Sequence, residues 1–316
     1  MYIQCHDALS VGTVLLVIKR RIEMKIIKPS VEFFGEVPTD YTNTLRFIEK
    51  AGRTCYKSED KITYSSAEGF VKRLISAGHL AMVEHSNFVV RCPADGWSSE
   101  LLDDLIVAAG KYLNVHISEE FICVGGNLTA WYHRIIDFYE GELPGVFTPV
   151  ILRYGEIFGN PRNTGFSDIW VPCSCGEIPK ALHRYSAKFI CDRGVSHELV
   201  RHRPCSFAQE STRYVNYGGQ DMEFIEPAGF EGWADKAVQV FKETCHFAEY
   251  GYAEMLEDGL APQQARAVLP NALKTEIIVT ADAAEWAHIK KLRTHPSAHP
   301  DMVRVMNMMP WEDFLG

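Results

Sequence analysis

The spacing of hydrophobic and polar residues predicts several β-strands from Met24 onward. Residues 24–29, 85–94, 183–194 and 273–282 alternate between the two classes or form short apolar runs. Successive side chains of a strand point to opposite faces, so these four segments are predicted strands. We expect Gly194 to end the third strand, because glycine interrupts regular strand structure.

Helical spacing, with apolar residues three or four positions apart, predicts most of the other elements. The expected helices cover residues 42–56, 65–79, 100–113, 126–139, 233–259 and 283–295, and a further helix begins at Pro262. Thr42 is the expected cap of the first helix, and Ser65 with Glu68 has the spacing of a capping box. Together these elements predict an α+β fold, a mixed sheet with packed helices.

The same reading gives expected domain boundaries. Residues 24–316 are expected to form the main domain, with a mostly helical insertion at residues 94–182 and an N-terminal extension at residues 1–23. Residues 8–18 are apolar, but this run is too short to span a membrane and its positive charges follow it. We therefore predict neither a signal peptide nor a membrane helix there.

Composition narrows the function. The net charge is -9 and the sequence pI is about 5.8, which argues against nucleic-acid binding through a basic face. The 9 cysteines are irregularly spaced, which is typical of reduced thiols in a cytoplasmic protein. Cys173 and Cys175 have no second pair at zinc-site spacing, so no metal site is predicted. Glycine motifs of the Rossmann or P-loop type are absent from the sequence.

The segment RHRPCSFAQESTRY, residues 201–214, concentrates cationic side chains in this acidic chain. Pro204 is expected to end a helix that carries Arg201, which leaves residues 204–213 as a loop with free amides and hydroxyls. Ser206, Ser211 and Arg213 then suggest a phosphate cradle, because guanidinium groups match phosphate oxygens two at a time. The residues alone predict a small anionic, phosphorylated ligand. They leave open a solvated basic helix end with internal Glu–Arg pairs.

The run Arg201-His202-Arg203, followed by seven residues and Ser211, resembles the signature of the flavin-dependent thymidylate synthases, also called the thymidylate synthase-complementing protein family. Further blocks resemble the family in the same order; they lie at residues 51–56, 77–88, 265–270, 290–302 and 310–314. The resemblance covers most of the chain from Met24 onward and implies the fold of that family.

This resemblance also implies a reaction and its participants. The family converts dUMP to dTMP, with methylenetetrahydrofolate as one-carbon donor and with FAD that is reduced by NADPH. Its members are homotetramers whose sites combine several subunits. The resemblance therefore implies a cytoplasmic methyltransferase that acts on neither nucleic acid nor membranes.

Site residues follow from the matched positions. Those implied to bind dUMP are Glu198, Arg201, Gln209, Ser211, Arg213, Arg266 and Arg293. Those implied to bind FAD or folate are His79, Ala81, Glu84, Arg201, His202, Arg203, Gln209, Asp282 and His288. Arg293 is also the implied catalytic residue: a fixed guanidinium beside the uracil ring stabilises the negative charge that makes carbon 5 nucleophilic.

Some features depart from the family pattern. Glu198 and His299 stand where compact members carry glutamine, Gln209 stands where other members carry glutamate, and compact members lack residues 94–182. Glu198 is expected to repel a phosphate. Two alternative functions stay open: a uracil methyltransferase with Cys205 as nucleophile, and a non-catalytic nucleotide-binding homologue.

Overall fold

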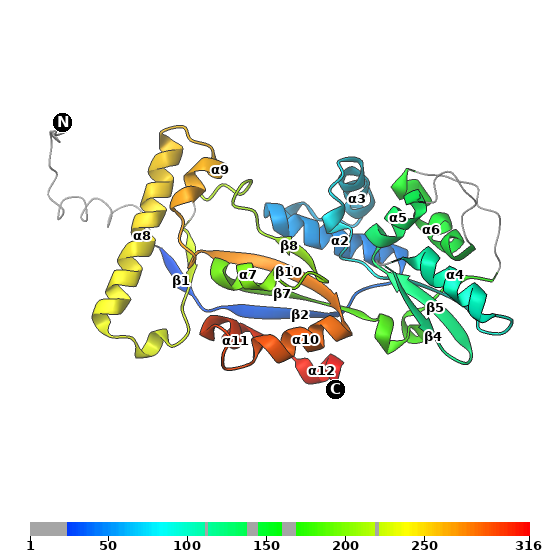
Figure 1. Cartoon of the computed structure of the whole chain (residues 1–316). Helices are drawn as coiled ribbons and strands as arrows, with labels where there is room; N and C mark the ends of the chain where they lie inside the picture. Colours follow the sequence, from blue (N-terminus) through cyan, green and yellow to red (C-terminus); the bar gives the residue numbers. More distant parts are fainter. Residues whose placement is uncertain (1–23, 111–112, 138–144, 160–168, 219–220) are drawn as a thin grey trace, which may run out of the picture.

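A four-stranded antiparallel sheet forms the centre of the computed structural model, which describes residues 24–110, 113–137, 145–159, 169–218 and 221–316 (Figure 1). Its strand order is β2 (Ser30–Glu36), β7 (Arg184–Asp192), β10 (Lys274–Asp282) and β8 (Ser206–Gln209). The longest pairing joins β7 to β10, from Lys274 opposite Asp192 to Asp282 opposite Arg184. This pairing brings the predicted strands at residues 183–194 and 273–282 side by side.

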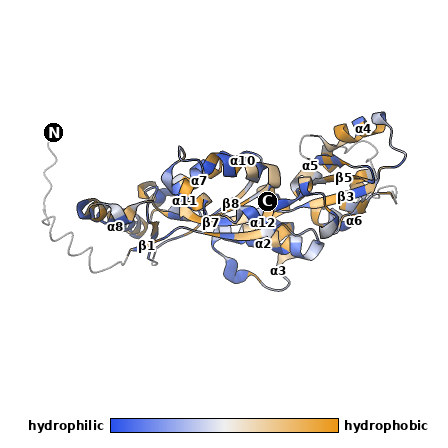
Figure 2. Ribbon diagram, turned by 90° about the horizontal axis from the view of Figure 1, so that it is seen from below, coloured by the Kyte–Doolittle hydropathy of each residue, from blue (hydrophilic) through white to orange (hydrophobic). Residues whose placement is uncertain are grey.

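Helices cover both faces of this central sheet (Figure 2). One face carries α7 (Arg193–Leu199), α10 (Ala283–Arg293), α11 (Pro300–Met306) and α12 (Trp311–Leu315), and the other carries α2 (Tyr41–Tyr56), beside which lies α3 (Ser66–Ser76). The alternation along β10 explains the two layers. Ile277 and Val279 pack with Trp286 of α10, whereas Ile278 packs against α2.

A second antiparallel sheet, of order β4-β5-β3-β6, forms with its helices a region that we call the lobe, the described residues of 87–172. Its strands are β3 (Phe88–Pro93), β4 (Asn114–Ile117), β5 (Phe121–Gly126) and β6 (Val171–Pro172). Its helices are α4 (Ser99–Ala109), α5 (Leu128–Asp137) and α6 (Thr148–Phe158). Aromatic side chains, among them the fully buried Trp131 and Tyr154, fill its core.

The opposite end of the molecule is built on the long helix α8 (Asp235–Glu257), beside the parallel pair β1 (Lys25–Ile27) and β9 (Glu223–Ile225) (Figure 1). Phe224, Cys245 and Tyr252 form its small core. The shorter elements are α9 (Pro262–Ala265), η1 (Glu59–Lys61), η2 (Leu80–Met82), η3 (Gly145–Phe147), η4 (Cys175–Glu177), η5 (Lys180–Leu182), η6 (Phe230–Gly232) and η7 (Arg266–Val268).

The α+β class is confirmed, with a parallel pair beside two antiparallel sheets. The described part of residues 94–182 contains the three α-helices α4, α5 and α6, and also β4, β5 and β6, which the sequence analysis did not foresee. The expected extension at residues 1–23 lies outside the described residues. No described helix is long and apolar enough to cross a membrane.

Several predictions of helix caps and of element ends were wrong. Asp40, and not Thr42, caps α2, and the side chain of Ser65 makes no capping bond to α3. Helix α7 ends at Leu199, well before Pro204, and Gly194 lies inside it instead of ending a strand. The segment expected to be a loop, residues 204–213, contains strand β8, because Phe207 and Ala208 pair with β10.

Candidate functional site

Arg293, at the last turn of α10, is held by side chains from α7 and from the turn that follows it. Its Nη1 donates to Glu198 Oε2 at 2.7 Å, and its Nη2 donates to the Glu198 carbonyl oxygen at 3.0 Å. Its Nε donates to His202 Nε2 at 3.0 Å. All three guanidinium nitrogens therefore have partners, and these contacts fix the plane of the group.

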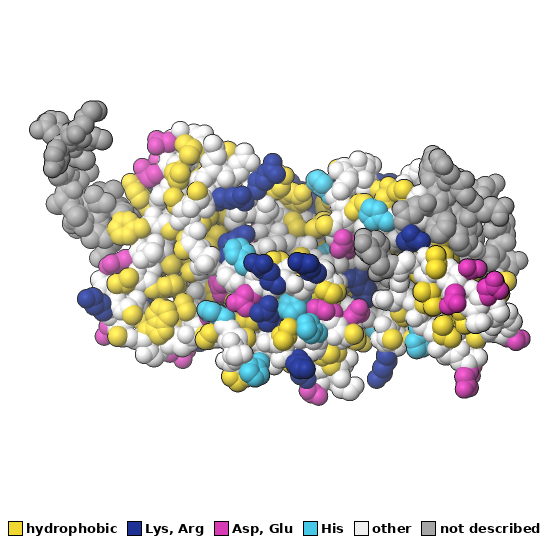
Figure 3. Space-filling view, in the orientation of Figure 1, with side chains coloured by type: hydrophobic (Ala, Val, Ile, Leu, Met, Phe, Trp, Pro, Cys, Tyr) yellow, Lys and Arg dark blue, Asp and Glu magenta, His cyan; other side chains and the backbone are white. Residues whose placement is uncertain are grey.

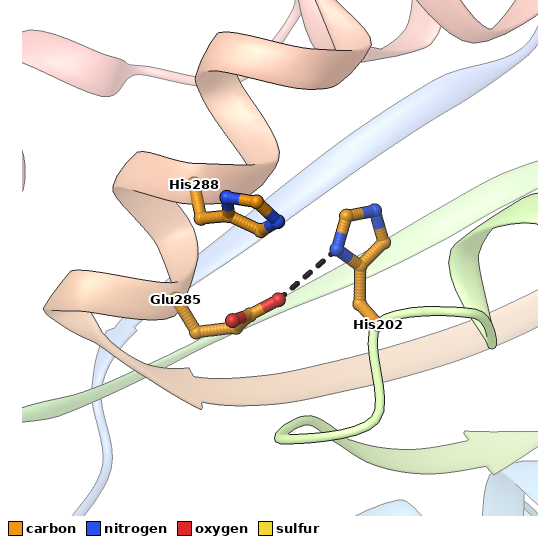
Figure 4. A group of neighbouring side chains, drawn as sticks. All are labelled: His202, Glu285 and His288. Carbon is orange, nitrogen blue, oxygen red and sulfur yellow. Dashed lines mark hydrogen bonds and ion pairs between the residues drawn. The ribbon is translucent and has the colours of Figure 1, made fainter.

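The contacts of His202 define its protonation. Because Arg293 Nε is a donor, His202 Nε2 accepts and carries no proton; Nδ1–H then donates to Glu285 Oε1 at 3.0 Å (Figure 4). Burial lowers the pKa of His202, and the nearby Arg293 lowers it further, whereas the Glu285 carboxylate opposes both. Glu285, His202, Arg293 and Glu198 thus form one chain of hydrogen bonds around a neutral imidazole.

His202, Glu285 and His288 also offer atoms that could ligate a metal, all within 4.8 Å of one another. The His202 and His288 rings meet edge to face, with centroids 5.8 Å apart (Figure 4). However, His202 Nδ1 already donates to Glu285, and the guanidinium of Arg293 lies on the other side of the ring. A dication here would break that bond beside a fixed positive charge, so the geometry favours the hydrogen-bonded chain.

A second group of cationic side chains gathers near α9. Arg213 Nε donates to Gln263 Oε1 at 3.3 Å, and Arg266 Nη1 donates to Thr212 Oγ1 at 3.3 Å. Both arginines are exposed, as are Arg201 and Arg203. Figure 3 shows Lys and Arg side chains gathered in the middle of this face of the molecule, with histidines and carboxylates beside them. Of the predicted phosphate cradle, Arg213 is thus accessible to an anion, whereas Ser206 was wrongly included, because it is buried and accepts from Arg184 Nη2 at 3.1 Å.

Two of the predicted nucleotide residues lie close to strand β8. Ser211 is half-buried, its amide donates to the Cys55 carbonyl at 3.0 Å, and its hydroxyl accepts from the Arg213 amide at 3.3 Å. Gln209 instead directs its amide nitrogen to the hydroxyls of Ser196 and Thr275, at 2.8 and 3.3 Å. In this arrangement Ser211 borders the cationic group, and Gln209 braces α7 against β10.

Predicted flavin residues meet at a cavity of about 630 Å³. Glu84, Arg203 and Asp282 line it, together with the buried Arg184 and Ser206. Burial raises the pKa of Glu84, and Ser206 and Arg184 partly offset this effect. Arg184 Nη1 anchors the segment beneath the cavity, because it donates to the carbonyl oxygens of Glu84 and Ser86 at 3.1 and 3.0 Å. The cavity therefore combines acidic and basic groups.

Four further residues singled out in the sequence do not line this cavity. His79 and Ala81 are exposed at η2, a few residues before Glu84, and neither lines the cavity. His288 joins the Arg293 group through its ring contact with His202. His299 caps α11, where its ring accepts from the Asp301 amide.

A second cavity, of about 450 Å³, is lined by Lys57, Glu210 and Tyr214, among others. Glu276, which also lines it, belongs to an ion cluster in which Lys274, Lys188 and Lys57 all contact its carboxylate. These contacts outweigh the effect of burial and lower the pKa of Glu276 to about 2. Three lysines thus share the carboxylate of Glu276 beside this cavity.

The structure argues against Cys205 as a nucleophile. The side chain is 7% exposed, and burial raises the pKa of its thiol, with nearby Glu285 acting in the same direction. A thiol that resists ionisation is a poor nucleophile. The described cysteines, Cys205 among them, form no disulfide.

Sequence reasoning missed several residues of the site. Glu285, Thr212, Gln263 and Arg184 contact predicted site residues, and Asn127 and His133 of the lobe line the cavity of Glu84. Glu285 had one available signal: it lies three positions before His288, so both share a face of α10. The others are brought in by tertiary packing alone.

Comparisons with known proteins bear on the family resemblance. Residues 182–312 match the family model of the thymidylate synthase complementing protein. Relatives named flavin-dependent thymidylate synthase include one from Geobacter sulfurreducens, 40% identical over 101 residues, which cover 32% of this chain and 43% of that protein. One from Mycolicibacterium vanbaalenii is 35% identical over 125 residues, which cover 35% of this chain and 48% of that protein.

The chain spans less than half the length of the curated relatives it matches. A solved structure, that of a UMP/dUMP methylase PolB from Streptomyces cacaoi bound with 5-Br dUMP, aligns over 92% of this chain and 93% of that chain. Its TM-score of 0.40 and identity of 16% are too low to carry an argument about function. From residue 182 to residue 312, however, the resemblance predicted from the sequence is confirmed: this region is similar to the thymidylate synthase complementing protein family.

Proposed function

We propose that this protein is a flavin-dependent thymidylate synthase, which methylates dUMP to dTMP with methylenetetrahydrofolate as one-carbon donor and with FAD that is reduced by NADPH. The observation that carries the proposal is the fixed guanidinium of Arg293, held by Glu198 of α7 and by His202 of the signature segment. The relatives named for this activity support it.

The nucleotide is proposed to lie along the exposed cations. Arg213 and Arg266 are each held by one neutral side chain, Gln263 and Thr212, which leaves guanidinium N–H groups available to a phosphate. The Ser211 hydroxyl lies beside Arg213 and adds a neutral donor. Arg201, exposed on the turn after α7, is a further cation proposed to take part. Gln209 is assigned a supporting part through Ser196.

Arg293 is proposed to polarise the uracil ring. Negative charge must build at the N3/O2 side before carbon 5 attacks the one-carbon unit, and a fixed cation stabilises that charge without losing a proton. Glu198 moderates this role, because its carboxylate pairs with Arg293 at 2.7 Å. A ring that approaches Arg293 must therefore share the guanidinium with Glu198, whose charge is already compensated and repels phosphate less than a free carboxylate.

The residues expected to hold the flavin suit a molecule with a diphosphate and a polar ring. Arg201 and Arg203 are exposed cations suited to phosphate, while Glu84 and Asp282 offer acceptors at the cavity wall. His79, Ala81, His202 and His288 are assigned to the same region. When bound, the flavin would supply the redox chemistry of the methyl transfer. The chain's own part is to orient the two ligands and to keep His202 neutral beside Arg293.

We further propose a homotetramer that works in the cytoplasm. Helix α8 presents the apolar side chains of Val240 and Phe247, whose exposed fractions are 53% and 45%, and Trp233, which is 38% exposed, lies just before the helix. Val240 and Phe247 are seven positions apart, the spacing at which one face of a helix meets a partner. A second copy of the chain is the partner that the family resemblance suggests.

The decisive experiment tests flavin binding and turnover together. Purified protein should show a flavin absorption band that bleaches with NADPH, and it should form dTMP from dUMP and methylenetetrahydrofolate. Arg293→Ala should abolish dTMP formation and leave the flavin band, whereas Lys291→Ala, an exposed cation on the same helix, should leave both unchanged. A colourless protein that takes up no flavin on reconstitution would refute the proposal.

A further inference from the structure

The cavity that contains Glu84, Arg203 and Asp282 has a second wall, which the lobe supplies. This lobe wall consists of Asn87, Asn114, Gly125, Gly126, Asn127, Thr129, Ala130 and His133. None of these residues lies within residues 182–312, the part that matches the family model, and none belongs to the expected flavin residues. The residues assigned to the flavin therefore account for one side of the cavity only.

Asn87 gives the lobe wall a buried acceptor. Its side chain is 0% exposed, and its Nδ2 donates to the Leu182 carbonyl at 3.0 Å. Its Oδ1 has no hydrogen-bond partner in the part of the chain that the structure describes. A buried acceptor without a partner is unfavourable, so a ligand N–H group that reaches the cavity would satisfy it.

Asn127 and His133 give the same wall its donors. Asn127 Oδ1 caps α5 by accepting from the Ala130 amide at 2.8 Å, which leaves its Nδ2 without a partner among the described residues. His133 lies on α5, is exposed, and makes no hydrogen bond to another described residue. The lobe wall thus offers an acceptor and donors but neither a carboxylate nor a lysine or arginine.

We propose that the lobe wall binds a neutral, planar heterocycle that carries an amide group, with an N–H donor next to a C=O acceptor. Side-chain amides recognise such an edge by paired hydrogen bonds, and a cavity of about 630 Å³ is large enough to admit one ring system with its substituent. The inference rests on the proposed function, whose cosubstrates offer this chemistry twice: in the pterin of the folate and in the nicotinamide carboxamide of NADPH.

The test uses the full chain loaded with FAD and two variants of the lobe wall. Asn127→Asp keeps the oxygen that caps α5 but replaces the donor with an acceptor, so the helix stays capped while ligand binding is disturbed. His133→Ala removes an exposed side chain and should fold normally. His116→Ala is the matched control, because His116 lies on β4 of the lobe and does not line the cavity. Anaerobic titrations with tetrahydrofolate, NADPH and dUMP are measured by calorimetry.

We expect Asn127→Asp to weaken the binding of one of the two cosubstrates about tenfold or more, and His133→Ala to weaken the binding of the same cosubstrate severalfold. The affinity for dUMP should change less than twofold. Weaker binding of tetrahydrofolate identifies the pterin as the occupant, and weaker binding of NADPH identifies the nicotinamide. Unchanged binding of both in both variants, or equal weakening in His116→Ala, overturns the inference even if the protein makes dTMP. Failure of the unaltered protein to make dTMP would instead count against the proposed function, because the binding titrations do not depend on turnover.

Discussion

Glu285 contacts no group assigned to a substrate, yet its replacement should lower turnover. Its carboxylate accepts the Nδ1–H of His202 at 3.0 Å, and this bond leaves Nε2 free to accept from Arg293. Both side chains are largely buried, with exposed fractions of 13% for Glu285 and 5% for His202. Glu285→Ala would therefore leave Nδ1–H as a buried donor without a partner.

The expected cost follows from that burial. Leaving a buried donor unsatisfied costs about 1–3 kcal/mol of unfolding free energy, whereas Glu285→Gln keeps an acceptor oxygen and should cost about 1 kcal/mol. Urea unfolding measures both values. Glu312→Gln is the matched control, because Glu312 of α12 pairs at 3.0 Å with Lys290 of α10, the helix that carries Glu285, but is 85% exposed. Loss of this ion pair should change the free energy of unfolding by less than about 0.5 kcal/mol.

The protonation of His202 is the readout that a merely structural role would not move. Nitrogen-15 NMR of the imidazole should show a proton on Nδ1 alone at neutral pH, and Glu285→Gln should lower the pKa of His202, since the carboxylate is what raises it. Turnover should fall more than the affinity for dUMP. A His202 that carries its proton on Nε2, or on both nitrogens, at neutral pH would refute the reasoning, because Nε2 could not then accept from Arg293.

Three further outcomes are expected. Burial lowers the pKa of His85 to about 3, so below pH 6.5 the unfolded chain takes up a proton that the folded chain does not. The unaltered protein should therefore lose unfolding free energy between pH 6.5 and 5, and His85→Gln should reduce that loss by about 1.1 kcal/mol per pH unit. Urea unfolding measures both slopes, and an unchanged slope would contradict this. Glu198→Gln should strengthen dUMP binding by about 1.5- to 5-fold in equilibrium titrations, because a partly exposed ion pair with Arg293 is worth about 0.2–1 kcal/mol; weaker binding would show that Glu198 contacts the nucleotide directly. Cys205→Ala should retain dTMP formation, since the buried thiol resists ionisation, and complete loss with intact flavin binding would restore the cysteine mechanism.

The sequence by itself determined the elements that carry long periodic patterns and the chemistry of the signature segment. The strands near residues 183–194 and 273–282 and the long helix near residues 233–259 were predicted because burial of one face imposes a period of two or of about 3.6 residues. The cluster Arg201-His202-Arg203 was visible because it concentrates cations in an acidic chain. Such signals are local, so one chain suffices to show them.

Only the tertiary structure decided which partners those residues take. The pairing of β8 with β10 made a strand of the expected loop, since two neighbouring strands satisfy backbone groups that a loop would leave to solvent. Glu198, expected to face the nucleotide as a repelling charge, instead pairs with Arg293, and Glu285 sets the tautomer of His202 from 83 positions away. The lobe reaches the cavity of Glu84 in the same way. Contacts between distant segments depend on packing and leave no periodic mark in the sequence.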